Sequence, residues 1–410
     1  MNNNDIEFVQ SIPNKLPTVK IPPAIFKKLK KGSPWVYRNS LSEIEALAEE
    51  MPEGGWVRIS SSDKSGGLAL FDPENAIALR IFDTSLYTYF VPALLSKRIF
   101  DAIEIRSSID RDQTSGIRLI HGEGDLLPGL VIDQYGPLLV IRPDCDAWVP
   151  YLQIVLKILH ELVQFSAAYL VTKSFKGWIE NSMELPVLFF ENGLKFYADP
   201  SAGQKTGFFL DMRANRLFMG RFAKNLSLLN CFSYTGGFSI YARHFGATFT
   251  HNVDISPGVI EAARQNHALN NQEDEKTTYL AADLFTYLET LPLIEKNRKD
   301  PGKGKYDIIL LDPPAFAHSQ AAILTALESY KKLNQLALER LGHGQYLATA
   351  SCSSRVSEAE FLQAILEAAD ASGRNLIQIY RHGADLDHPV SSDSGIMPYL
   401  KFFLFKIDFI

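Results

Sequence analysis

The chain has 410 residues, of which 46% are hydrophobic and 21% are charged, and its formal net charge is −6 at pH 7. This length predicts two or three domains, and the charge argues against indiscriminate nucleic-acid binding, although a local basic patch can still bind phosphates. No apolar run approaches the roughly 20 residues that span a bilayer, so we expect no membrane segment. Three cysteines without C-x-x-C spacing predict neither a disulfide framework nor a zinc site, and they favour a cytoplasmic location.

Residues 1–75 are predicted to form a compact β-rich domain, because short strand-like runs at 56–60 and 68–71 alternate with Pro, Gly and Asp turns. The only dense basic run of the sequence lies here beside Trp35, and it comprises Lys27, Lys28, Lys30 and Lys31. A solvated loop is the simpler interpretation of these lysines. An RNA-docking face is the functional alternative, with ammonium groups on phosphates and the aromatic ring on a base.

Residues 76–190 are predicted to form a small α/β domain. Amphipathic helices are expected at 90–106 and 151–165, and strands at 117–120, 130–133 and 138–142. The acidic turn between the first two strands, HGEGD, is typical of a hairpin connection. His121 and Glu123 could ligate a metal, but no third ligand is suggested, and we expect no metal site.

Residues 191–410 alternate between strands and helices, which predicts a mostly parallel, doubly wound α/β sheet. Strands are expected at 226–230, 250–254, 278–281, 306–311, 345–350, 376–381 and 399–407. Helices are expected at 239–245, 257–270, 321–341 and 358–371. A polar, Gly-flanked loop at 203–216 precedes the first strand, where it can act either as a lid or as a helix cap.

The first strand of this sheet leads through a Gly-containing turn, Gly236-Gly237, into a helix. Such a turn presents backbone N–H groups to a cofactor, and Asp254, about 20 residues further on, is placed to bind ribose hydroxyls. The turn is not G-x-G-x-x-G, so a dinucleotide fingerprint is a poor match. An ordinary turn of an α/β protein explains this stretch equally well.

Polar residues follow four consecutive strands, namely Asp254, Asp283, Asp312 and Cys352. Because ligands of open α/β sheets bind at the carboxyl ends of strands, these side chains are predicted to converge on one crevice. Asp312 begins the stiff loop Asp-Pro-Pro-Ala-Phe, in which Pro313, Pro314 and Phe316 can hold a flat heterocycle. Cys352 is flanked by serines and precedes a helix, a setting that favours a nucleophilic thiolate.

These motifs resemble those of class I S-adenosylmethionine (SAM)-dependent methyltransferases. The whole chain resembles the bacterial large-subunit ribosomal RNA methyltransferase I family, which forms 5-methylcytosine in 23S ribosomal RNA. The matching segments are SPWVYRNS, IRLIHGEGDLLPGLVIDQYG, GQKTGFFLDMRANR, LNCFSYTGGFS, VDIS, DPPAF and SCSS. The resemblance implies a PUA-like RNA-binding domain, a central α/β domain and a Rossmann-like methyltransferase domain. It is compatible with a homodimer.

The resemblance also implies roles for individual residues. The methionine part of SAM would lie against the first turn, formed by Asn230, Phe232, Ser233, Tyr234, Thr235, Gly236 and Gly237. Asp254 with Ile255 would bind its ribose and Asp283 its adenine, while the lid would contribute Lys205, Thr206, Phe209 and Asp211. Asp312 would lie beside SAM and steady the target base, and Cys352 would attack C6 of the cytosine.

Three positions depart from the family pattern, since Ala315 replaces a common Lys, and Leu126 and Ser354 replace common glycines. An N-methyltransferase of ribosomal RNA guanine is the nearest alternative, because related enzymes share similar segments and need no nucleophile. A catalytically silent RNA-binding factor and a dehydrogenase are further alternatives. The cysteine of the SCSS segment favours carbon methylation.

Overall fold

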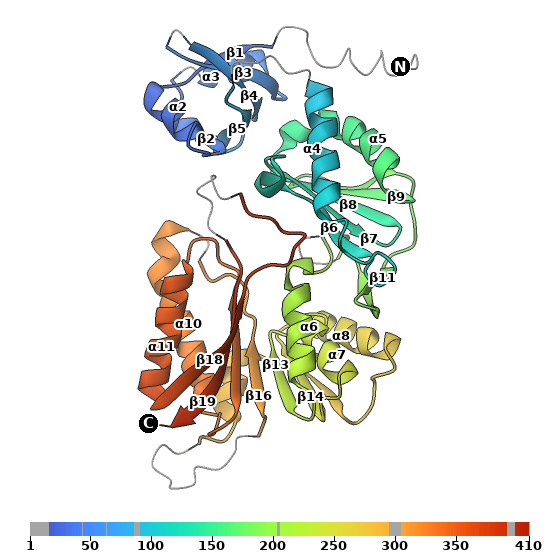
Figure 1. Ribbon diagram of the computed structural model, residues 1–410, viewed down its shortest axis with the longest axis vertical. Helices are drawn as coiled ribbons and strands as arrows, with labels where there is room; N and C mark the ends of the chain where they lie inside the picture. Colours follow the sequence, from blue (N-terminus) through green and yellow to red (C-terminus); the bar gives the residue numbers. More distant parts are fainter. Residues whose placement is uncertain are drawn as a thin grey trace. The chain divides into compact units, whose positions relative to one another are not determined.

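The computed structural model describes residues 16–42, 44–62, 64–85, 91–202, 206–294, 305–317, 319–391 and 398–409 (Figure 1). The contacts divide the chain into two compact units. The first comprises Met1–Gly193, Tyr197–Leu210 and Leu386–Ile396, and the second comprises Leu194–Phe196, Asp211–Asp385 and Met397–Ile410.

The first unit begins with a five-stranded sheet of order β1-β3-β4-β5-β2. Its strands are β1 (Thr18–Lys20), β2 (Trp35–Tyr37), β3 (Gly55–Ser61), β4 (Lys64–Phe71) and β5 (Ile77–Asp83). Helices α2 (Pro23–Leu29) and α3 (Ile44–Glu50), with the short 3₁₀ segment η1 (Arg38–Ser40), complete the module. Because β5 belongs to this sheet, the module extends beyond the sequence-based boundary at residue 75.

The basic cluster lies on α2 and at its end, rather than in the loop expected from the sequence. Lys27 and Lys28 are on the helix, Lys30 and Lys31 follow it, and all four side chains are exposed. Pro23 begins the helix at a position where a missing N–H costs nothing, while the apolar side chains Phe26 and Leu29 are buried in the module. The helix therefore anchors itself through its apolar face and presents the lysines to solvent.

The second part of this unit contains a five-stranded sheet of order β10-β9-β8-β7-β6. Its strands are β6 (Gly116–His121), β7 (Leu130–Tyr135), β8 (Leu138–Pro143), β9 (Ala167–Val171) and β10 (Lys176–Glu180). Its helical segments are α4 (Val91–Ile105), η2 (Gly122–Asp125), η3 (Asp146–Tyr151) and α5 (Leu152–Leu162). The two-stranded sheet of β11 (Val187–Glu191) and β12 (Leu194–Ala198) follows.

A short segment from far along the chain packs within this first unit. Asp387 is fully buried, and its carboxylate accepts a hydrogen bond from the backbone N–H of Arg118 at 3.0 Å. The guanidinium of Arg106 donates to the carbonyl oxygen of Asp387 at 2.8 Å and also pairs with the buried carboxylate of Asp125. By these contacts residues 386–391 belong to the first unit, although the sequence assigned them to the domain at 191–410.

The second unit contains a seven-stranded sheet of order β15-β14-β13-β16-β17-β19-β18. The strands are β13 (Ser227–Cys231), β14 (Phe249–Asp254), β15 (Thr277–Ala281), β16 (Ile308–Leu311), β17 (Tyr346–Ser351), β18 (Arg374–His382) and β19 (Lys401–Phe409). The first five strands pair in parallel, and β19 returns antiparallel between β17 and β18. The mostly parallel, doubly wound sheet predicted from the sequence is confirmed, and the antiparallel β19 makes it a mixed sheet.

Helices cover both faces of this sheet, with α6 and α7 on one side and α10 and α11 on the other (Figure 1). The helical segments are η4 (Leu210–Met212), α6 (Arg213–Phe222), α7 (Gly237–His244), α8 (Pro257–Leu269), α9 (Leu284–Thr290), η5 (Gln320–Ala322), α10 (Ile323–Leu338) and α11 (Glu358–Ser372). A hydrophobic core lies on each face of the sheet, and successive strand residues point into opposite cores. Leu228 packs with α6 and α7, whereas Leu229 packs with α9 and α10. Within the described ranges, no helix is both long and apolar enough to cross a membrane.

Candidate active site

The carboxyl ends of the parallel strands form one edge of the seven-stranded sheet. Cys231, the last residue of β13, is in register with Val253 of β14 and with Leu311 of β16. Leu311 is in turn in register with Thr349 of β17, two residues before that strand ends. The chain leaves β13 and β16 toward opposite faces of the sheet, and such a switch point is where open α/β sheets bind ligands. The four predicted polar positions therefore follow strands at one edge.

The turn after β13 has an unusual backbone. Phe232, Tyr234 and Gly236 have φ values of 57°, 46° and 83°, which lie in the left-handed region. Non-glycine residues rarely adopt this conformation, and it concentrates at functional sites. The turn is fixed to the next strand by hydrogen bonds from Ser233 N–H to the carbonyl of Val253 and from Tyr234 N–H to a carboxylate oxygen of Asp254, both 3.1 Å long.

Several buried polar atoms in this turn have no hydrogen-bond partner among the described residues. They are Oδ1 of Asn230, Oγ of Ser233 and Oγ1 of Thr235. The amide nitrogen of Asn230 is satisfied, since it donates to Ser239 and Asn252. Because buried polar atoms are nearly always paired, this concentration fits a polar ligand bound in the turn.

The predicted ribose and adenine residues follow the next two strands. Asp254 is half-buried, and its carboxylate accepts hydrogen bonds from the N–H groups of Tyr234 and Ser256, so it also shapes the turn. Ile255 is 68% exposed. Asp283 is exposed and caps α9 by accepting from Thr286 N–H at 2.9 Å. Asp283 therefore stabilises the start of α9, whether or not it also contacts a ligand.

The Asp312–Pro313–Pro314 loop leaves β16 beside the turn, and Asp312 N–H lies 3.4 Å from the carbonyl oxygen of Cys231. Pro313 is buried, while Asp312 and Phe316 are half-buried and Pro314 is exposed. The ring of Phe316 contacts the buried ring of Tyr330, with centroids 4.8 Å apart.

Cys352 follows β17 and is half-buried, with its Sγ 3.9 Å from the carbonyl oxygen of Pro313. The adjacent hydroxyl of Ser351 donates to the phenol oxygen of Tyr330 at 2.9 Å. Burial, with smaller contributions from the charges of Cys352 and Asp312, raises the pKa of Tyr330 to about 12, so the phenol stays neutral near both groups. The thiol and the carboxylate-bearing loop thus lie side by side, as the sequence predicted.

The other two cysteines have different surroundings. Burial raises the pKa of Cys145 to about 12 and raises that of Cys231 as well, so both stay protonated at neutral pH. Cys231 ends β13 with its side chain in the sheet core. Only Cys352 among the three is partly open to solvent.

The predicted lid residues are distributed over both units, and Lys205 lies outside the described residues. Thr206 is fully buried in the first unit, where its hydroxyl donates to Asp133 at 2.5 Å and lies 2.9 Å from the phenol oxygen of Tyr135. Phe209 is half-buried in the same unit. Asp211 is buried in the second unit and accepts a 2.6 Å hydrogen bond from the Tyr399 hydroxyl.

Trp35 was predicted as a base-stacking residue, and its indole N–H donates to Glu123 of the HGEGD turn at 2.8 Å. Burial raises the pKa of Glu123, while the hydrogen bond from Trp35 partly offsets this. Leu126, at a common glycine position of the family, has φ 57° and is 54% exposed. No group of three or more His, Cys, Asp or Glu side chains that could hold a metal occurs within the searched, described ranges.

Sequence reasoning missed two residues that contact the segment around Cys352, namely Tyr330 and Lys401. The signal for Lys401 was a lysine directly before the apolar run Phe402–Phe405, an arrangement that suggests a buried charge.

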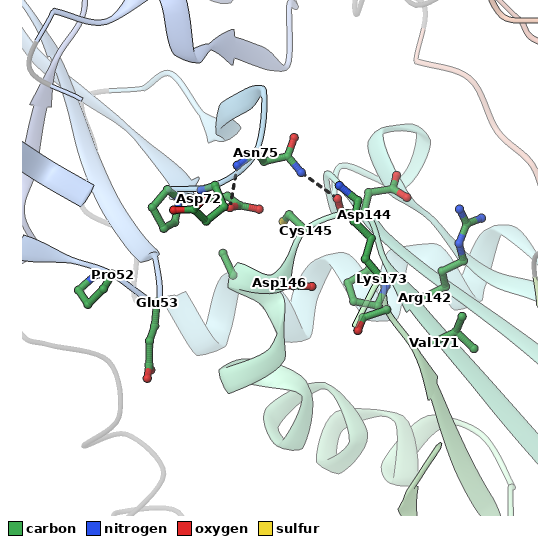
Figure 2. Close-up of a pocket in the computed structure, with 15 residues that line it drawn as sticks. Pro52, Glu53, Asp72, Asn75, Arg142, Asp144, Cys145, Asp146, Val171 and Lys173 are labelled. Carbon is green, nitrogen blue, oxygen red and sulfur yellow. Dashed lines mark hydrogen bonds between the residues drawn. The ribbon is translucent and has the colours of Figure 1, made fainter. Parts of the chain in front are cut away.

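A separate cavity of about 430 Å³ lies in the first unit, and none of the predicted site residues lines it. Its wall includes Glu53, Asp72, Asn75, Arg142, Asp144 and Lys173 (Figure 2). Asn75 bridges Asp72 and the carbonyl of Asp144 through two hydrogen bonds, 3.2 and 3.1 Å long, which explains how the polar groups at this wall are held.

Comparison with known proteins agrees with this geometry. A family model described as S-adenosylmethionine-dependent methyltransferase matches residues 171–375, and a PUA-like domain model matches residues 19–84. A protein of Shewanella frigidimarina named ribosomal RNA large subunit methyltransferase I is 32% identical over 93% of this chain and 97% of its own length. A ribosomal RNA large subunit methyltransferase of Deinococcus radiodurans is also 32% identical, over 93% of this chain and 95% of its length.

Solved structures share the fold. A methyltransferase crystallised with SAH superposes with a TM-score of 0.78 at 21% identity, covering 95% of this chain and 100% of that one. A structure from Streptococcus mutans described as a SAM-dependent methyltransferase gives the same TM-score and coverage at 20% identity. These matches, together with the edge of the sheet described above, show that the chain belongs to the SAM-dependent ribosomal RNA large subunit methyltransferase I family.

Proposed function

We propose that this enzyme methylates C5 of a cytosine in 23S ribosomal RNA through a covalent adduct between Cys352 and C6 of the base. The observation that carries the proposal is the position of Cys352, whose Sγ lies 3.9 Å from the Pro313 carbonyl beside Asp312. A reaction at a ring nitrogen needs no thiol at this place, because the nitrogen lone pair attacks the methyl donor directly. The names of the relatives support the ribosomal RNA substrate.

The first turn and Asp254 would hold SAM. The unpartnered oxygens of Asn230, Ser233 and Thr235 can accept hydrogen bonds from its α-ammonium group, and Asp254 can accept from ribose hydroxyls. Gly237 allows a close approach within the protein, because an added Cβ would lie 2.8 Å from Cδ of Arg216. When bound, SAM supplies an electrophilic methyl group.

The side chains of this protein would perform the remaining chemistry. The Cys352 thiolate adds to C6 of an unstacked cytosine, and the electron pair of the C5–C6 double bond becomes available at C5. The carboxylic acid form of Asp312 donates its proton toward N3 and so offsets the negative charge that develops on the ring. After C5 has received the methyl group, a base removes the C5 proton, the double bond re-forms, and the thiolate leaves.

The N-terminal module would bind the RNA. The exposed lysines at 27, 28, 30 and 31 present four positive charges, which suits a phosphate backbone. The indole of Trp35 is only half-buried, and its hydrogen bond to Glu123 leaves its ring face as the part that can contact a base. Ribosomal RNA as the substrate makes the cytoplasm the compartment that we propose.

The test is tritiated methyl transfer from SAM to ribosomal RNA by the wild type, Cys352→Ala and the matched control Cys145→Ala. We expect Cys352→Ala to abolish transfer, Cys145→Ala to retain it, and mass spectrometry of the wild-type product to detect 5-methylcytidine. Survival of transfer in Cys352→Ala would instead identify an N-methyltransferase. Absence of transfer in the wild type would point to a silent RNA-binding factor.

A second measurement captures the adduct itself. RNA containing 5-fluorocytidine cannot release a C5 proton, so the thiolate is not expelled after methyl transfer. We expect a covalent protein–RNA species that requires SAM and Cys352. A wild-type enzyme that methylates RNA but leaves no such species would contradict the covalent route.

A further inference from the structure

Lys401 is a buried lysine next to the proposed nucleophile. It is the first residue of β19, pairs in register with Ser351 of β17, and is 2% exposed. The residues after it in β19, Phe402 to Phe405, are fully or almost fully buried. A buried ammonium group is costly, so a specific arrangement must hold it in place.

Three backbone carbonyls surround the ammonium nitrogen. Nζ donates to the carbonyl oxygens of Ser353 and Val356, both at 2.5 Å, and to that of Tyr399 at 3.1 Å. Ser353 and Val356 belong to the segment that directly follows Cys352. Lys401 thus uses its donors on neutral oxygens, and its positive charge forms no ion pair within the part of the chain that the structure describes.

The charged and titratable groups around Lys401 come from every element that packs against it. Burial lowers the pKa of Lys401 to about 8, whereas the negative charges of Cys352, Glu358 and Glu360 raise it. Glu360 caps α11 through Ser357, and the Tyr399 hydroxyl is bound to Asp211. The Tyr330 phenol accepts a hydrogen bond from Ser351, the residue before Cys352, and stays neutral. Lys401 is therefore mostly protonated at pH 7.

We propose that Lys401 is a positioning residue for Cys352: its ammonium group fixes the turn after β17 and favours the thiolate over the thiol. This inference rests on the proposed role of Cys352 as a nucleophile. A positive charge near a thiol stabilises the ionised form, and an interaction between two titrating groups acts on both of them. The carbonyl contacts alone would hold the turn, so the charge is the part of the proposal that needs a test.

The test is the pH profile of alkylation by iodoacetamide, read at Cys352 by peptide mass spectrometry, with Cys352→Ala as background. Lys401→Gln keeps N–H donors for the carbonyls but removes the charge, and Lys401→Arg keeps the charge. We expect Lys401→Gln to shift the midpoint upward and to slow alkylation at pH 7 about tenfold, while Lys401→Arg stays close to the wild type. Equal profiles for the wild type and Lys401→Gln would overturn the proposal.

Lys401→Met provides a second neutral variant if Lys401→Gln does not fold. If neither variant folds, the wild-type enzyme is used instead. The midpoint of the pH profile for Cys352 alkylation is then compared between the native enzyme and the enzyme unfolded in urea. A lower native midpoint supports the proposal, and an equal or higher one overturns it.

Alkylation involves no methyl transfer, so the two proposals fail separately. If Cys352→Ala retains RNA methylation, the proposed function fails whatever the alkylation profiles show. If Cys352→Ala is inactive but the Lys401→Gln profile is unchanged, only the role of Lys401 fails.

Discussion

The two halves of the candidate active-site edge differ in whether backbone groups or side chains form the site. Around β13 and β14 the backbone forms the site, with three left-handed residues between positions 232 and 236 and N–H groups bound to Asp254 and Val253. Around β16 and β17 the side chains form it, since two prolines remove N–H donors and leave Asp312 and Cys352 as the groups that we propose to react. The first half should therefore be sensitive to backbone conformation and the second to chemical identity.

The largest expected contrast is between the cysteines that end or follow strands in the two halves. Burial raises the pKa of Cys231, so almost no thiolate forms at pH 8, whereas Cys352 is partly open to solvent. We expect Cys352 to be alkylated at least ~10³-fold faster than Cys231 in the native enzyme. Mass spectrometry of single labelled peptides measures both rates, and unfolding in urea is the control that should equalise them. Comparable native rates would break the comparison.

The second prediction concerns the acid of the side-chain half. Asp312→Asn keeps the shape of the side chain and can still donate a hydrogen bond, but it cannot transfer a proton to N3 as negative charge develops on the cytosine ring. We expect the methylation rate to fall roughly 100-fold. Calorimetry should give a SAM affinity close to that of the wild type. A rate close to wild type would show that Asp312 has no part in the reaction, and a large loss of affinity would place it with the cofactor instead.

Sequence reasoning predicted the edge of the sheet well because the pattern there is local. The five parallel strands begin and end within about two residues of their predicted positions, and Asp254, Asp312 and Cys352 follow them as expected. Buried strands of β/α units are continuous apolar runs, and the residue that ends such a run is visible in the sequence alone. Helix α9 was missed, since its seven residues are too few for a clear helical period.

Contacts that depend on distant pairing were not predictable. Lys401 reaches the Cys352 segment only because β19 returns antiparallel beside β17 in the register that places it opposite Ser351. The hydrogen bond from Trp35 to Glu123 joins residues 88 positions apart, and no local pattern indicates it. The family resemblance assigned Thr206 to the SAM site. In the structure its hydroxyl is hydrogen-bonded to Asp133 and Tyr135.

The third prediction tests the backbone half. Gly236 has φ 83°, and an added Cβ would lie 2.9 Å from Cε1 of His267. Gly236→Ala combines about 1 kcal/mol of backbone strain with this clash, so we expect SAM affinity to fall about tenfold. Gly258→Ala is the matched control, because an added Cβ there meets no atom within 4 Å. Equal calorimetric affinities for the two variants would refute a backbone-built cofactor site.

The smallest effect is expected for the hydrogen bond between Ser351 and Tyr330, next to the proposed nucleophile Cys352. Tyr330→Phe removes the hydroxyl that accepts from Ser351 but keeps the ring against Phe316, so the turn before Cys352 should loosen only slightly. A hydrogen bond contributes about 1 kcal/mol net, and we expect kcat to fall about two- to fivefold. Ser351→Ala should cost more stability, because it removes the donor to the buried Tyr330 hydroxyl and also the acceptor of Ser353 N–H. Thermal unfolding of both single variants and the double variant checks this order: the loss of stability in the double variant should be smaller than the sum of the single losses, since both single changes remove the same Ser351–Tyr330 hydrogen bond. Strictly additive losses would show that the two hydroxyls act independently.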